Sequence, residues 1–317
     1  MAQVLHGRDG FRDAEFERQR ALDAYRVVDT LPETAFDDIA RLAATVCDAP
    51  VALVSLIDRD RQWFKAKVGT GMQQTARDEA VCDYAIRAPG GLLEVPDLAR
   101  DPRFAGYPAV AGVEGARFYA GVPLVTPGGV AIGTVCVVDR RPRTLEPAQR
   151  AALASLARLV INLLEDRQRE RVLERAAFLA SPAGNEDAPP HTYQVALIQL
   201  QGHAELVQAR GERIAEKILR GFDAALEACL PSGSADAIDR TTDSAEFVAI
   251  LHGDDAATTL DCLRHAANAA AREAGLAIAI GAAESVDGME PLEPVFLRAD
   301  EALTVEKDKL RPKRAAA

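Results

Sequence analysis

Apolar and polar positions in the first 145 residues follow patterns of both helices and strands. An apolar stripe at helical spacing follows Pro32, with acidic residues in its first turn, which predicts a helix beginning there. Strand-like segments follow at 51–57, 62–67, 120–125 and 131–138. The last two flank Thr126-Pro-Gly-Gly, a turn sequence typical of a hairpin. This pattern predicts an α+β domain whose antiparallel sheet is flanked by helices.

The period becomes helical after Pro147. Its apolar stripe consists of Leu153, Leu156, Val160, Leu163 and Leu164. An almost wholly charged stretch, 165–171, follows before Val172, Leu173 and Ala176 resume the stripe. We expect a long amphipathic helix over 145–180 that dimerises through this stripe, making the protein a homodimer. The alternative is a single helix that packs back on its own domain.

A second pattern of alternating strands and helices begins after a Pro- and Gly-containing linker at 181–192. Its predicted elements are a strand at 195–201, a helix at 212–230, a strand pair around 247–251, a helix at 256–274, a strand at 276–280 and a last helix ending at Lys309. We therefore expect an α+β / α/β two-domain protein. The predicted parts are an N-terminal segment (1–19), a first domain (20–144), a connecting helix (145–180), the linker (181–192) and a second α/β domain (193–317).

Composition narrows the class of protein. A length of 317 residues suits about two domains, and a net charge of −11 argues against nucleic acid or anionic lipid as the main partner. No stretch approaches the ~20 apolar residues of a membrane span, and the charged N-terminal sequence does not resemble a secretory signal. The five cysteines form no Cys-x-x-Cys pair, so we expect a cytoplasmic protein without disulfides or a metal site.

Short motifs follow one another in a defined order through the first domain. They are Asp29-Thr-Leu-Pro-Glu33, Phe36-Asp-Asp-Ile39, Arg61-Gln-Trp-Phe-Lys65, Val95-Pro-Asp97, Asp101-Pro-Arg-Phe104, Arg117-Phe-Tyr-Ala-Gly121 and Gly133-Thr-x-Cys136. In this order, over about residues 20–165, they resemble the GAF domains of bacterial signalling proteins. The resemblance implies a small-molecule or redox sensor, or a dimerising regulatory module, coupled through its C-terminal helix to an output.

Several aromatic and polar residues are candidates for the ligand pocket of such a domain. They are Trp63, Cys82, Tyr84, Asp97, Arg117 and Tyr119. The alternatives are core packing for Trp63, and an ion pair with Asp97 or Asp101 for Arg117.

Cys82 stands where this GAF group often has Phe-Cys-x-His-x-Ile, but Tyr84 replaces the histidine. The neighbouring Asp83 opposes a thiolate. A buried structural Cys82 is therefore favoured over bilin attachment or redox sensing, and Cys47 and Cys136 are assigned to the core.

The second domain resembles a GGDEF (diguanylate cyclase) domain. The segment Arg298-Ala-Asp-Glu-Ala-Leu303 resembles that family's final helix, and Asp243-Ser-Ala-Glu-Phe247 occupies the place of its signature. The resemblance implies formation of cyclic di-GMP from two GTP molecules with Mg²⁺, which prefers carboxylate ligands.

The residues for that chemistry are missing. Gln199 and Gln201 stand at the acidic positions of the first strand. In the degenerate signature, Asp243, Ser244 and Ala245 replace two glycines and an acid, and only Glu246 and Phe247 remain. We expect neither catalytic residues nor a metal cofactor here.

The favoured hypothesis is a cytoplasmic signal-transduction protein, in which a GAF module responds to an unknown small molecule and an inactive GGDEF-like domain binds an unknown protein partner. One alternative is an active diguanylate cyclase that binds Mg²⁺ through Gln199, Gln201 and Glu246. Another is a receptor that holds GTP or cyclic di-GMP without turning it over. No nucleic-acid partner is expected.

Overall fold

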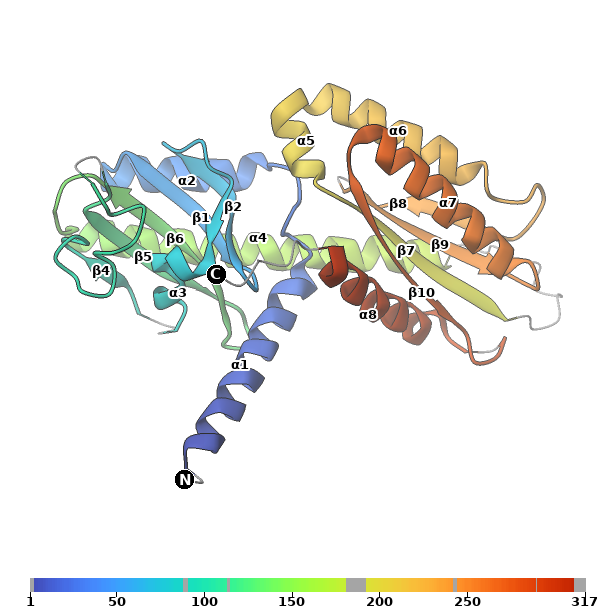
Figure 1. Cartoon of the computed structure of the whole chain (residues 1–317), viewed down its shortest axis with the longest axis horizontal. Helices are drawn as coiled ribbons and strands as arrows, with labels where there is room; N and C mark the ends of the chain where they lie inside the picture. Colours follow the sequence, from blue (N-terminus) through green and yellow to red (C-terminus); the bar gives the residue numbers. More distant parts are fainter. Residues whose placement is uncertain are drawn as a thin grey trace. The chain divides into compact units, whose positions relative to one another are not determined.

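The computed structural model describes residues 3–87, 91–112, 115–180, 192–241, 244–288 and 290–310. The chain divides into two compact units (Figure 1). The first consists of Met1–Val28 and Pro32–Glu170, and the second of Asp29–Leu31 and Arg171–Ala317. The division falls within one continuous helix, α4 (Pro147–Ala180). The predicted linker at 181–192 lies outside the described residues except for Thr192.

The first unit contains a six-stranded antiparallel sheet in the order β3-β2-β1-β6-β5-β4. Its strands are β1 (Val51–Ile57), β2 (Arg61–Val68), β3 (Gln74–Ala76), β4 (Leu93–Val95), β5 (Phe118–Val125) and β6 (Ala131–Asp139). The four predicted strands are confirmed. The sequence analysis missed β3 and β4, which have three residues each and are too short to show an alternating pattern.

The helices of the first unit include two, α1 and α3, that the sequence analysis did not predict. They are α1 (Gln3–Tyr25), α2 (Thr34–Cys47), the 3₁₀ turn η1 (Arg77–Glu79), α3 (Val81–Ala85) and the first part of α4. The predicted N-terminal segment is thus largely helical. The end of α1 brings Leu22 and Tyr25 into the core, where both are buried.

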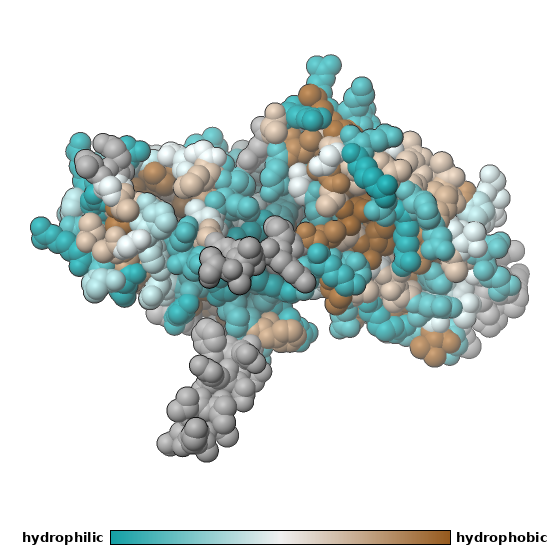
Figure 2. Space-filling view, viewed as in Figure 1, coloured by the Kyte–Doolittle hydropathy of each residue, from teal (hydrophilic) through white to brown (hydrophobic). Residues whose placement is uncertain are grey.

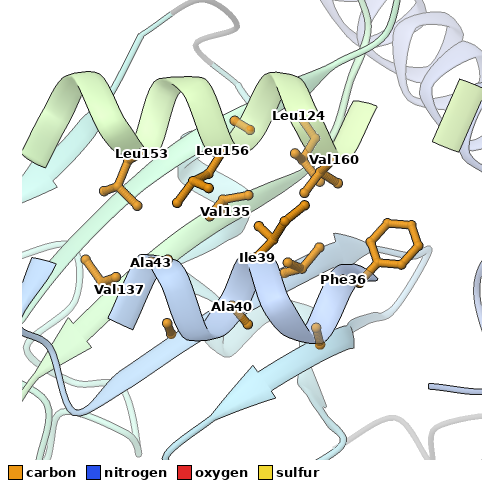
Figure 3. Close-up of a cluster of buried hydrophobic side chains, with 14 of the residues drawn as sticks. Phe36, Ile39, Ala40, Ala43, Leu124, Val135, Val137, Leu153, Leu156 and Val160 are labelled. Atoms are coloured by element: carbon orange, nitrogen blue, oxygen red, sulfur yellow. The ribbon is translucent and has the colours of Figure 1, made fainter. Parts of the chain in front are cut away.

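Helices α2 and α4 cover one face of this sheet (Figure 3). Ile39 of α2 and Leu156 and Val160 of α4 meet the side chains of Val135 and Val137 on β6. The five members of the predicted dimerisation stripe at 153–164 pack into this core, with Leu163 only partly buried. The prediction that this part of the stripe joins two copies is therefore wrong, because the sheet of the same unit already covers it. The side chains of Val172, Leu173 and Ala176 lie outside the description.

The second unit is an antiparallel four-stranded sheet in the order β10-β7-β9-β8 with helices on both faces. The strands are β7 (Tyr193–Gln201), β8 (Ala237–Arg240), β9 (Glu246–His252) and β10 (Ala277–Glu284). The helices are α5 (His203–Arg210), α6 (Glu212–Glu227), α7 (Ala256–Ala274) and α8 (Leu292–Leu310). The predicted strands and helices are confirmed, and the two units together have the predicted mixed α/β class.

Alternating side chains on β7 and β9 build a core on each face of this sheet. Helices α6 and α7 pack on one face and α8 on the other. Gly281 of β10 allows the close approach of α8, since a Cβ there would overlap the backbone of Ala299 and Leu303. Hydrophobic residues also gather on the surface between α7 and α8, where β10 is an outer strand (Figure 2).

Cys229 and Cys262 form a disulfide in the second unit, with their Cα atoms 5.7 Å apart. The expectation of a disulfide-free chain is therefore wrong. It rested on the lack of short cysteine spacings, whereas this pair is separated by 33 positions in the sequence. Cys47, Cys82 and Cys136 are free and buried. Among the helices of the described residues, none combines the length and apolar character that crossing a membrane requires.

Candidate functional site

A cavity of about 300 Å³ opens on the face of the first sheet opposite α2 and α4. Its walls are mainly apolar and include Val51, Leu53, Phe64, Leu98 and Val110. These side chains come from β1, β2 and the loops that cross this face. A largely apolar hollow of this size suits a small molecule.

A group of hydrogen-bonding side chains gathers around the sulfur of Cys82 in this cavity. The Tyr119 hydroxyl donates to Cys82 Sγ at 3.2 Å, and Gln62 Nε2 donates to it at 3.1 Å. The sulfur of Cys136 lies 3.7 Å away. Gln62 Nε2 also lies 2.9 Å from Ser55 Oγ. We call Ser55, Gln62, Cys82, Tyr119 and Cys136 the thiol cluster.

The local sequence explains how these groups meet. Thr134 and Cys136 are two positions apart on β6, so both point to the cavity face. The register shift between Val54 and Ser55 on β1 adjusts the pairing with β2 beside this cluster. On β5, Gly121 leaves room for the ring of Tyr119, because a Cβ at Gly121 would overlap the tyrosine hydroxyl.

The two thiols of the cluster differ in acidity. Burial disfavours the Cys82 thiolate, but the hydrogen bonds to its sulfur, led by that from Cys136, lower the pKa of Cys82 to about 6. The pKa of Cys136 is raised well above its ordinary value by its hydrogen bond to Cys82, by burial and by the charge of Cys82. Two adjacent thiols do not both ionise easily, and the hydrogen bonds that Cys82 Sγ accepts favour the thiolate of Cys82 over that of Cys136.

The carboxylate of Asp83 does not oppose this thiolate in the way the sequence suggested. It pairs with Arg77, whose Nε lies 2.7 Å from Asp83 Oδ1, and with Arg87. Both arginines offset its negative charge.

The structure places Trp63 and Tyr84 outside the cavity lining. Trp63 belongs to the core under α2 and α4, while its neighbour Phe64 points to the cavity, as alternation along β2 requires. Tyr84 follows Cys82 on α3 and packs edge-on against Phe104, with the ring centroids 4.9 Å apart. Of the six predicted pocket residues, Cys82 and Tyr119 line the cavity.

Asp97 and Arg117 also have partners elsewhere. Asp97 pairs with Arg100 at 3.4 Å. The Arg117 guanidinium donates to the backbone oxygens of Val110 and Ala116 at 2.8 and 3.0 Å. Arg117 therefore supports the loop that closes over the cavity, and the expected ion pair with Asp97 or Asp101 is not formed.

In the second unit, the signature segment forms the turn between β8 and β9. The Ser244 hydroxyl donates to the backbone oxygen of Thr241 at 3.0 Å, and Glu246 begins β9. Ala245 is partly buried and Phe247 is in the core. Asp243 lies outside the described residues.

The side chains of Glu246 and Gln199 are brought together here, since these residues are cross-strand partners on β9 and β7. Glu246 is 3% exposed, and its Oε1 lies 3.2 Å from Nη2 of Arg171 on α4. Within the described part of the chain, the buried Oε1 of Gln199 and Nε2 of Gln201 have no hydrogen-bond partner. No group of three or more His, Cys, Asp or Glu side chains among the described residues could hold a metal ion.

Comparison with known families identifies the domain around the thiol cluster. Residues 31–164 match the model of the GAF domain family. The first unit contains a GAF domain. A cyclic di-GMP phosphodiesterase of Pseudomonas aeruginosa is 36% identical over 175 residues, which cover 55% of this chain. The chain spans 29% of that relative's length.

Solved structures similar to this chain include both GAF and GGDEF domains. The GAF domain of an Acinetobacter phosphoenolpyruvate-protein phosphotransferase has 16% identity and a TM-score of 0.37, covering 55% of this chain and 98% of that one. The GGDEF domain of DgcB from Caulobacter crescentus, in complex with c-di-GMP, has 18% identity and a TM-score of 0.34, covering 46% and 85%.

The sequence analysis missed three members of the thiol cluster as site residues. It assigned Cys136 to the core and did not consider Ser55 or Gln62 of the GAF domain. Cys136 could have been found from the alternation of its strand, which puts it on the face opposite Val135 and Val137. The proximity of its sulfur to Cys82 could not, because 54 positions separate the two residues.

Proposed function

We propose that this chain is a signal-transduction protein whose GAF domain senses a small molecule and whose second unit, a GGDEF-like domain, acts on a protein partner without catalysis. The largely apolar cavity, with Gln62, Cys82 and Tyr119 in its lining, supports the sensing role. The similarity to a cyclic di-GMP phosphodiesterase supports a place in signalling by that nucleotide. Location in the cytoplasm is part of the same proposal.

The observation that carries the proposal of inactivity is the environment of Glu246. A cyclase must gather Mg²⁺ ions on carboxylates. Here the cross-strand partner of Glu246 is the neutral amide of Gln199, and Arg171 occupies the carboxylate itself. Because the guanidinium of Arg171 already pairs with Glu246, its positive charge repels a Mg²⁺ ion that would bind the same carboxylate.

A chain of charged contacts in the first unit supports coupling from the sheet to α4. Glu33 accepts a hydrogen bond from Lys65 Nζ on β2 at 2.6 Å and also pairs with Arg167 on α4. Tyr25 of α1 donates to Glu165, two positions before Arg167 on α4. Movement in the sheet would therefore alter contacts that hold α4.

A homodimer through 145–180 stays part of the proposal, but it requires side chains other than the buried stripe.

Incubation of the full chain with GTP and Mg²⁺ or Mn²⁺ tests the proposal, with cyclic dinucleotide formation and thermal melting as readouts. Neither turnover nor a melting shift is expected. Bound nucleotide at ~100 times its dissociation constant would add about 2.7 kcal/mol to the free energy of unfolding. Turnover would overturn the proposal, and a shift in melting temperature with GTP or cyclic di-GMP, without turnover, would favour the receptor alternative.

The Gln199→Asp/Gln201→Asp variant tests whether carboxylates at these two positions suffice for metal binding.

A further inference from the structure

We propose that Cys82 and Cys136 are a peroxide-sensitive thiol pair that closes to a disulfide inside the GAF cavity. The inference rests on the sensing role proposed above and names the chemical class of its stimulus, a small hydroperoxide such as hydrogen peroxide. The disulfide would be distinct from the Cys229–Cys262 bond of the second unit.

The geometry of the two sulfur atoms supports this pairing. They lie 3.7 Å apart in one cavity lining, and the S–S bond of a disulfide is about 2.05 Å long. Closing the bond therefore needs an approach of less than two ångströms. Cys82 is carried by α3, a helix of five residues, whereas Cys136 is held in the middle of β6. We expect α3 to make most of the movement.

The cavity can admit the oxidant although both cysteines are buried. Its volume of about 300 Å³ is several times that of a water molecule, which has a share of about 30 Å³ in the liquid. The thiol cluster offers hydrogen-bond donors from Tyr119 and Gln62 beside the sulfur.

The reaction consists of two displacement steps. The Cys82 thiolate attacks one oxygen of the peroxide, the O–O bond breaks, and Cys82 becomes a sulfenic acid as hydroxide takes up a proton to leave as water. Cys136 then attacks the Cys82 sulfur, an S–S bond forms, and the S–O bond breaks to release a second water. Two thiols lose two electrons in total, and one peroxide is reduced to two waters.

Two observations assign Cys82 as the attacking residue. The hydrogen bonds from Tyr119 and Gln62 converge on its sulfur, where they stabilise negative charge. Its lowered pKa, beside the raised pKa of Cys136, agrees with this assignment.

The fold gives the new bond a route to α4. Cys136 lies between Val135 and Val137, whose side chains point to the opposite face of the sheet and pack in the core shared with α4 (Figure 3). Oxidation also removes the thiolate to which Tyr119 and Gln62 donate. A disulfide on the cavity face would thus alter the strand that supports the helix.

The test treats the full chain with a small excess of hydrogen peroxide, denatures it without reductant in the presence of an alkylating reagent, and maps the linked peptides by mass spectrometry. We expect a Cys82–Cys136 link that dithiothreitol reverses, with the Cys229–Cys262 link present before and after. Absence of the first link in the wild-type chain, with both cysteines still alkylated or oxidised beyond sulfenic acid, would overturn the proposal.

Three variants test the order of events. In Cys136→Ser, Cys82 should stop at a sulfenic acid that dimedone traps during denaturation. In Cys82→Ser, burial still raises the pKa of Cys136, and its peroxide-dependent labelling should be weaker than that of Cys82 in Cys136→Ser. Cys47→Ser is the matched control, because Cys47 is buried in the other core, and it should form the link at the wild-type rate. Equal labelling of Cys136 in Cys82→Ser would contradict the assigned order.

The outcome is separable from that of the proposed function. The peptide map reports on the GAF domain alone, whereas the nucleotide assay reports on the second unit. A chain that forms the link but also makes cyclic di-GMP would refute inactivity and leave the thiol pair standing.

Discussion

Arg171 on α4 forms an ion pair with Glu246 at the start of β9, with 3.2 Å between Nη2 and Oε1. Glu246 is the one acid of the segment 243–247 that the structure describes, and it is almost wholly buried. The part of α4 that belongs to the second unit therefore supplies the counter-charge for an acid at the start of β9. This contact links the connecting helix to the signature turn within the second unit.

Replacing Arg171 by alanine should destabilise the second unit. The variant leaves a buried carboxylate without its cation, which costs about 3 kcal/mol of unfolding free energy. Urea unfolding measures the loss. Arg169→Ala is the matched control, since Arg169 is exposed in its pair with Asp166 and should change stability by less than about 0.5 kcal/mol. Adding Glu246→Gln to Arg171→Ala should recover part of the loss, and no recovery would mean that charge is not the cause.

Leu156→Glu should unfold or strongly destabilise the first unit. Leu156 is 7% exposed and packs between α4 and the sheet, so a carboxylate there costs on the order of 4 kcal/mol. Leu159→Glu, three positions along the same helix, places the charge at a site 49% exposed and should cost less than about 0.5 kcal/mol. Thermal melting measures the loss of stability, and light scattering measures the oligomeric state of each variant. If the wild type is a dimer and the Leu156→Glu variant is a folded monomer, Leu156 lies in a dimer interface and its packing on the sheet is contradicted.

The stability contributed by Lys65 should depend on pH. Burial lowers the pKa of Lys65 from its ordinary value of 10.5 to about 8. Between these values the unfolded chain binds more protons than the folded one, so stability from this residue rises with pH. Lys65→Met removes that dependence, and Arg167 still pairs with Glu33.

The free energy of unfolding of the wild type, relative to that of Lys65→Met, should therefore rise by about 3 kcal/mol between pH 7.5 and 10.5. Chemical denaturation at several pH values measures it. A difference that is constant over this range would show that Lys65 keeps its proton when folded.

Alanine substitutions at two glycines of the second unit should have opposite signs. Gly281→Ala forces α8 away from β10 and should cost about 2 kcal/mol. Gly221→Ala, at an exposed position of α6 with open space around it, should stabilise by about 0.5–1 kcal/mol through helix propensity. Thermal melting of the two variants compares them directly. Equal effects would mean that α8 does not pack on Gly281 as closely as described.

Local patterns in the sequence were sufficient to predict most elements. The apolar run of β1, the hairpin of β5 and β6, and the helix α7 each carry a period of 2 or 3.6 that does not depend on distant residues. The helix α1 escaped prediction because most of its turns are highly charged. The neutral amides of Gln199 and Gln201 were also visible in the sequence, since they concern residue type alone.

The sequence could not determine which helix and strand faces pack against each other, or which distant residues pair. The stripe on α4 is as suitable for a second copy as for its own sheet, and only the tertiary structure shows that Leu156 and Val160 pack inward. The same holds for the pairing of Cys229 with Cys262 and of Arg171 with Glu246, and for the approach of Cys82 to Cys136.

The physical reason is the range of the interactions involved. Helix and strand periods, turns and residue chemistry are encoded over a few neighbouring positions, so the sequence by itself determined the order of elements, the motifs of the GAF domain and the amides at positions 199 and 201. Burial, hydrogen bonding and the acidity of a thiol depend on groups brought together from distant segments. Only the tertiary structure, through packing of the sheet against its helices and loops, decided that two core cysteines share a cavity.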